Sequence, residues 1–62
     1  MTPEQITAIV VATRTSDAWA IMDHARENLT DKGLRDDADM ALYYIAKVNR
    51  ALTEIASKGA DQ

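Results

Sequence analysis

The stretch LTDKGLRDDAD, residues 29–39, gathers four aspartates around a single glycine, Gly33. Clustered carboxylates are the ligands that Ca²⁺ prefers, and an EF-hand loop places a glycine at its sixth position and a glutamate at its twelfth. With Asp31 as position 1, those positions hold Asp36 and Leu42. The spacing therefore predicts a turn between two helices and no cation site.

In such a turn the same residues have structural roles. Gly33 is expected at the C′ position of the preceding helix, where a left-handed conformation costs glycine nothing. Leu29 and Leu34 would then make the hydrophobic contact of a Schellman motif across that helix end. Asp36 is expected to cap the next helix, with the two following aspartates facing the positive end of its dipole.

Asp23 and His24 are the best candidates for catalysis, because an imidazole beside a carboxylate can act as a general base. No serine or cysteine nucleophile stands in a recognisable motif near them. A helical di-metal site needs a glutamate three residues before the histidine, and that position holds Ile21. We therefore expect a protein that is not an enzyme and binds no cofactor or metal. A small enzyme that uses Asp23 and His24 is the third-ranked alternative.

Length and composition limit the fold that must position these residues. The chain has 62 residues, no cysteine, 47% hydrophobic residues and 27% charged residues, which predicts one globular domain without disulfides. A chain of this size buries only about 60% of its unfolded surface, so we expect reinforcement by self-association as a homodimer. The longest apolar run, residues 8–12, is far shorter than the ~20 residues of a membrane span.

Charge and the missing secretory signal restrict the location and the partners. No positively charged segment precedes an apolar run at the N-terminal end, which predicts a cytoplasmic protein that binds no membrane. The net charge is −3, and the lysines and arginines are scattered among acids. Phosphate binding needs clustered basic residues, so direct nucleic-acid binding is disfavoured and a protein partner is expected.

Hydrophobic periodicity predicts helices near residues 3–14, 16–32 and 36–58. Thr2, Pro3 and Gln5 form a helix start signal with a capping box. The apolar stripe then shifts by about half a turn around Thr15 and Ser16, which favours a break there. The alternative is that the first two helices form one continuous helix, with one apolar face for its own core and another for a partner.

The last expected helix carries an apolar series that alternates steps of four and three residues. Its members are Leu34, Ala38, Ala41, Ile45, Val48, Leu52 and Ile55. This heptad-like spacing is typical of the seam of packed antiparallel helices. The predicted fold is all-α, a small antiparallel helical hairpin or three-helix bundle that assembles through this seam. Because the last helix is longer than either earlier helix can cover alone, part of its seam is expected to be shared by the N-terminal helix or by a second copy of the chain.

The three aromatic residues, Trp19, Tyr43 and Tyr44, flank the apolar stripes. Each one either covers the edge of the core with its polar tip in water, or forms an interface hot spot. The surface predicted for self-association and partner binding comprises Trp19, Met22, Asp23, His24, Met40, Tyr43, Tyr44, Ile45, Val48, Arg50, Leu52 and Ile55.

Two stretches, MDHARENLTD (22–31) and ALYYIAKVNR (41–50), carry a family resemblance. In order and spacing they resemble the corresponding stretches of the Hha/YmoA family of small bacterial nucleoid co-regulators. The resemblance covers residues 13–55 and implies a helical protein that docks on the histone-like nucleoid-structuring protein, with Asp23 and Arg50 as the matching positions. The family's Asp-His-Arg reads Val48–Asn49–Arg50 here, and the family's C-terminal helix is missing.

The function expected from the sequence is therefore a small helical interaction protein that self-associates and regulates or adapts a protein partner. Such compact acidic regulators are common on phages and plasmids. The alternative is a nucleic-acid-associated regulator, either an Hha-like co-regulator or a helical hairpin that binds RNA.

Overall fold

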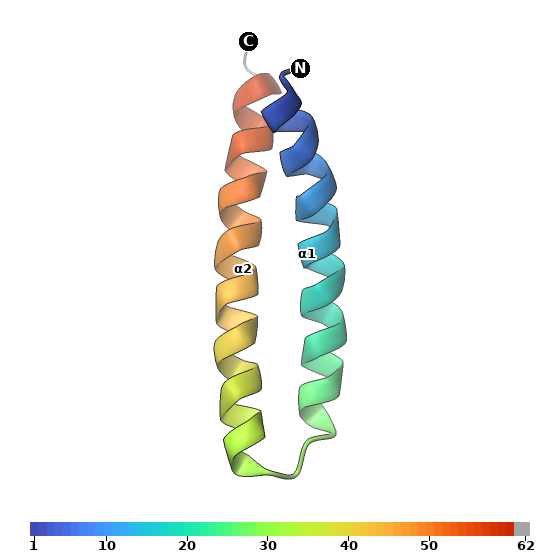
Figure 1. Cartoon of the computed structure of the whole chain (residues 1–62), viewed down its shortest axis with the longest axis vertical. Helices are drawn as coiled ribbons and strands as arrows, with labels where there is room; N and C mark the ends of the chain where they lie inside the picture. Colours follow the sequence, from blue (N-terminus) through green and yellow to red (C-terminus); the bar gives the residue numbers. More distant parts are fainter. Residues whose placement is uncertain (61–62) are drawn as a thin grey trace.

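The computed structural model of the chain describes residues 1–60, and the side chains of residues 1–58. These residues form two long helices, α1 (Pro3–Glu27) and α2 (Lys32–Ala60). The helices run antiparallel, side by side, and a short loop joins them at one end (Figure 1). The expectation of an all-α antiparallel hairpin is confirmed, and the three-helix bundle is wrong for the described residues.

The start of α1 confirms the capping box expected from the sequence. The Thr2 hydroxyl oxygen accepts a hydrogen bond from the Gln5 backbone N–H at 3.2 Å. The Thr2 backbone N–H donates in return to Gln5 Oε1 at 2.9 Å, and Pro3 occupies the first helical turn. Two of the otherwise unpaired groups at the helix start are thereby satisfied.

The break predicted at Thr15 and Ser16 is wrong, because α1 continues through both residues. The Thr15 hydroxyl donates to the Ala12 carbonyl at 3.0 Å, and the Thr13 hydroxyl donates to the Ile9 carbonyl at 3.1 Å. These side chains bond back to the preceding turn of the helix and leave its backbone ladder intact. The alternative of one continuous first helix is the correct one.

The helix boundaries at the loop also differ from the prediction. Asn28 is the C-cap of α1, and its side-chain amide donates to the His24 carbonyl at 3.1 Å. Asp31 caps α2, because its Oδ2 accepts a hydrogen bond from the Leu34 N–H at 2.9 Å. Asp36 therefore lies inside the second helix and does not cap it.

Gly33 lies in the first turn of α2 and not at the end of α1. No described residue, glycine or otherwise, has a positive φ angle. The Schellman motif predicted around Gly33 is therefore wrong, because the Asp31 cap starts the second helix four residues before the expected position. The second helix also continues to Ala60, two residues beyond its expected end.

One line of residues along each helix faces the other helix. The line of α1 takes alternate steps of three and four residues, and it comprises Gln5, Ala8, Ala12, Thr15, Trp19, Met22 and Arg26 in the helix and Leu29 in the loop that follows. The line in α2 comprises Ala38, Leu42, Ile45, Asn49, Leu52 and Ala56. All of these except Trp19 are buried or half-buried, and Trp19 is 39% exposed.

The seam predicted in the second helix is therefore correct only in part. Ala38, Ile45 and Leu52 lie on the α2 line, whereas Leu34 is 54% exposed and Val48 is 48% exposed. Asn49 takes the inward position that Val48 was expected to hold. The hairpin thus leaves part of the predicted seam facing outward.

The core of the hairpin is thin. Among the described side chains, only Ala8, Ala38 and Leu42 are buried. The hairpin measures 48 × 14 × 14 Å along its principal axes, and its radius of gyration is 14.3 Å. A compact domain of 62 residues would have a radius of gyration of about 10.6 Å. The elongated shape leaves few positions that the chain can shield from water by itself.

Candidate interaction surface

A polar contact joins the two helices near the middle of their length. The Asn49 side-chain amide donates to the Ala12 carbonyl at 2.7 Å and to the Thr15 hydroxyl oxygen at 2.8 Å. All three groups are partly buried. A polar residue on a packing line specifies the register of paired helices, because a shifted pairing would leave its amide without a partner.

An ion pair joins the helices nearer the loop. Arg26 Nη1 lies 2.8 Å from Asp39 Oδ1, and Arg26 Nη2 lies 3.8 Å from Asp23 Oδ1. Arg26 Nε is buried and has no hydrogen-bond partner among the described residues. The guanidinium therefore lies on the α1 packing line and uses its outer nitrogens to reach the carboxylates.

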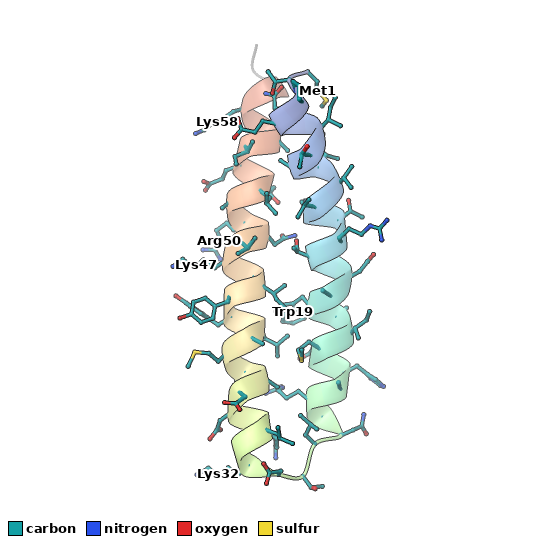
Figure 2. All side chains as sticks on the ribbon, in the orientation of Figure 1. Met1, Trp19, Lys32, Lys47, Arg50 and Lys58 are labelled. Carbon is teal, nitrogen blue, oxygen red and sulfur yellow. The ribbon has the colours of Figure 1, made fainter. Side chains whose placement is uncertain are left out.

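An open groove of about 450 Å³ runs between the helices on one side of the hairpin. Its walls include Ser16 and Trp19 of α1 and Ala46, Arg50 and Thr53 of α2. The predicted site residues Trp19 and Arg50 are therefore brought together, although they are 31 positions apart in the sequence. Figure 2 labels both residues and also shows Lys47 and Lys58 on the edge of α2 that faces away from α1.

Large apolar side chains cover much of the outside of the hairpin. Those exposed by more than about a third are Met1, Ile6, Ile9, Val10, Val11, Trp19, Ile21, Leu34, Met40, Tyr43, Tyr44 and Val48. Five of them, Trp19, Met40, Tyr43, Tyr44 and Val48, belong to the surface predicted from the sequence. The rings of Tyr43 and Tyr44 pack edge to face, with centroids 5.3 Å apart.

The other residues of the predicted surface lie in three different settings. Met22, Ile45 and Leu52 are half-buried on the packing lines, and Ile55 is half-buried beside them. Met22, Ile45 and Leu52 contribute to the core of the hairpin itself, and Ile55 lies at its edge. Asp23 is half-buried beside Arg26, and the His24 side chain is exposed on α1.

The structure adds two findings about metals and membranes. Among the described residues, no three His, Asp or Glu side chains come together as a metal site would require. Neither helix, within its described part, has an apolar stretch long enough to cross a bilayer.

No protein-family model matches the sequence, and no match was found among curated proteins or solved structures. The resemblance to the Hha/YmoA family therefore stays a prediction from the residues quoted above.

Sequence reasoning missed the main contacts between the helices. Asn49 was counted only as a departure from a family motif, although it stands four residues after Ile45 and three before Leu52. That spacing is the signal that places it on the packing line with those two residues. Leu42 was likewise passed over, and it stands at the same spacing between Ala38 and Ile45.

Proposed function

We propose that the protein is a non-enzymatic helical interaction protein, which self-associates as a homodimer and modulates a protein partner. One observation carries this proposal. Among the described side chains, those that are buried belong to two alanines and a leucine, and they remain 2–8% exposed, whereas twelve large apolar side chains are exposed.

The stability of a lone hairpin supports this proposal. Burial of apolar surface contributes roughly 25 cal/mol per Å², and ordering the chain costs about 1.5 kcal/mol per residue. A domain of about 60 residues is already marginal when its large apolar residues are inside. Here Ile6, Val10 and Ile21 of α1 lie outside. Association would remove such side chains from water and supply the missing stabilisation.

Regulation or adaptation of a partner protein is supported by the aromatic and arginine side chains on the surface. Trp, Tyr and Arg are the residue types most enriched at interface hot spots. Trp19 and Arg50 line one groove, and Tyr43 is 61% exposed. The resemblance to Hha/YmoA proteins, which act by docking on another protein, supports the same class of function.

Sedimentation equilibrium tests self-association. We expect the mass to rise from 6.8 kDa towards twice that value as the protein concentration increases into the tens of micromolar. The midpoint of urea unfolding, followed by circular dichroism, should rise over the same range, because association stabilises only the folded chain. A single 6.8 kDa species with a concentration-independent midpoint would refute self-association.

A pull-down tests the partner, with a tagged chain as bait and a Trp19→Ala/Arg50→Ala variant as the matched control. We expect a protein that the original chain retains and the variant loses. His24→Ala provides a second control, since loss of the same protein with this variant would point to the histidine and against the groove residues.

A further inference from the structure

The two broad faces of the hairpin differ in chemistry, and helical geometry defines them. Residues seven apart lie almost directly above one another on paired helices. On one side of its packing line α1 presents Val11, Ala18 and Ala25. On the matching side α2 presents Leu34, Ala41, Val48 and Ile55. Ile21 and Tyr44 lie next to these seven residues, on the side away from the packing lines. We call all nine residues together the apolar face.

The other face is polar along most of its length. Its equivalent positions hold Ile9, Ser16 and Asp23 in α1, Thr30 in the loop, and Lys32, Asp39, Ala46 and Thr53 in α2. The groove beside Trp19 contains Ser16 and Thr53 together, which shows that these positions of the two helices meet on one side. Ile6 and Ile9, near one end, and Tyr43 are exposed on this polar face.

Charge distinguishes the two faces further. The polar face has one more acid than it has bases, because five acids, Asp23, Glu27, Asp36, Asp39 and Glu54, stand against four bases, Arg26, Lys32, Arg35 and Arg50. Two copies that met through this face would bring like charges together. The charged residues around the apolar face are balanced, with Glu4 and Asp37 against Arg14 and Lys58. A second copy could meet this face without net repulsion.

The exposed area matches the requirement of one such contact. The chain exposes 4878 Å², whereas a compact monomer of this mass exposes about 3,950 Å². The excess of about 900 Å² is close to the roughly 800 Å² that each partner contributes to a standard interface. The chain therefore has surplus surface for about one interface of standard size.

We propose that a second copy of this chain packs against the apolar face, so that two hairpins form a four-helix bundle. This inference rests on the proposed self-association and specifies the surface that mediates it. The dimer buries Val48 and Leu34, the seam residues that the hairpin leaves exposed, and leaves the polar face and its groove free for a different partner. A contact between large and small side chains, such as Tyr44 and Ala18, suits close packing of two such faces.

The adjacent tyrosines provide a matched test. Tyr44 lies on the apolar face and Tyr43 on the polar face, their exposures are 54% and 61%, and either substitution removes the same ring contact. Sedimentation equilibrium should show association weakened about tenfold or more by Tyr44→Glu, because a charge is buried in an apolar contact. Tyr43→Glu should leave the dissociation constant within about twofold of the original chain.

Two exposed alanines of α1 provide a second matched pair. Ala18 lies on the apolar face and Ala20 on the opposite side of the helix. Ala18→Arg should weaken association about tenfold or more, and Ala20→Arg should leave it unchanged. Arginine is a good helix former, so this pair keeps the test valid where a tyrosine variant loses helical signal in circular dichroism.

The outcomes separate this inference from the proposed function. If the original chain is monomeric at all concentrations, the proposed self-association is wrong and the dimer face with it. If the original chain associates and Tyr43→Glu or Ala20→Arg weakens association as much as its matched variant, only the assignment of the face is overturned. Selective loss with Tyr44→Glu and Ala18→Arg supports the apolar face.

Discussion

Because Asn49 donates hydrogen bonds to Ala12 and Thr15, substitutions at Thr15 and Asn49 should affect the free energy of unfolding in a coupled way. Thr15→Val keeps the shape of the side chain but removes the oxygen that accepts from the Asn49 amide at 2.8 Å. Asn49→Ala removes that bond and the 2.7 Å bond to the Ala12 carbonyl. The two substitutions share one interaction, so their effects on the free energy of unfolding should not be additive.

The magnitude follows from the number and burial of the bonds. A typical hydrogen bond contributes about 0.5–1.5 kcal/mol net. Asn49→Ala removes two partly buried bonds but gains roughly 0.5 kcal/mol of helix propensity, so we expect a loss of about 1 kcal/mol. The coupling free energy between Thr15→Val and Asn49→Ala should be about 0.5–1 kcal/mol.

The assay is a double-mutant cycle measured by urea unfolding at one fixed protein concentration, because association also adds to the measured stability. Thr13→Val is the matched control. Its hydroxyl likewise donates to a carbonyl of the preceding turn, but Thr13 is exposed and makes no hydrogen bond to the described residues of α2. The cycle of Thr13→Val with Asn49→Ala should give a coupling free energy close to zero. Equal coupling in the two cycles would refute the assigned role of Thr15.

Four further substitutions, at three positions, test the loop end of the hairpin. Gly33→Ala should change the free energy of unfolding, measured in urea, by less than about 1 kcal/mol, because the gain in helix propensity is opposed by the new Cβ, which would meet the capping atom Asp31 Oδ2 at 3.3 Å. A loss clearly larger than this would contradict a helical Gly33 beside an intact Asp31 cap. Asp31→Ala should cost about 0.5–2 kcal/mol through loss of the α2 cap, whereas Asp31→Ser should retain most of the stability. Asp39→Asn should lower the free energy of unfolding by no more than about 1 kcal/mol, because the ion pair with Arg26 is partly exposed. This loss should become smaller in high salt, which screens the ion pair. A cost that persists in molar salt would contradict a screened ion pair.

The sequence predicted the elements that local chemistry determines. The Thr2 capping box was found because its residue types and spacing carry the mechanism within four positions. The break at Thr15 was predicted wrongly because a threonine hydroxyl can either compete with the helix or bond back to the preceding turn. In α1 it bonds back to Ala12, and in addition accepts from Asn49. The decisive partner lies 34 positions away, beyond the reach of local patterns.

The register of the second helix shows a similar limit. The apolar series through Val48 and the mixed series through Asn49 differ by one position and share Ala38, Ile45 and Leu52. Periodicity alone favours the purely apolar series. The structure favours the mixed one because Asn49 finds partly buried acceptors on α1. Only the positions of Ala12 and Thr15 in space decide between them.

Large and small apolar side chains are unevenly distributed between the inside and the outside of the hairpin. In an isolated amphipathic hairpin, the largest apolar residues would lie between the helices, because burial there contributes most to stability. In the first half of α1 the inward positions hold Ala8, Ala12 and Thr15, whereas Val10 and Val11 face outward. Small inward residues allow the two helices to approach closely. The large residues are then left to stabilise a contact outside the hairpin, so stability and association depend on the same side chains.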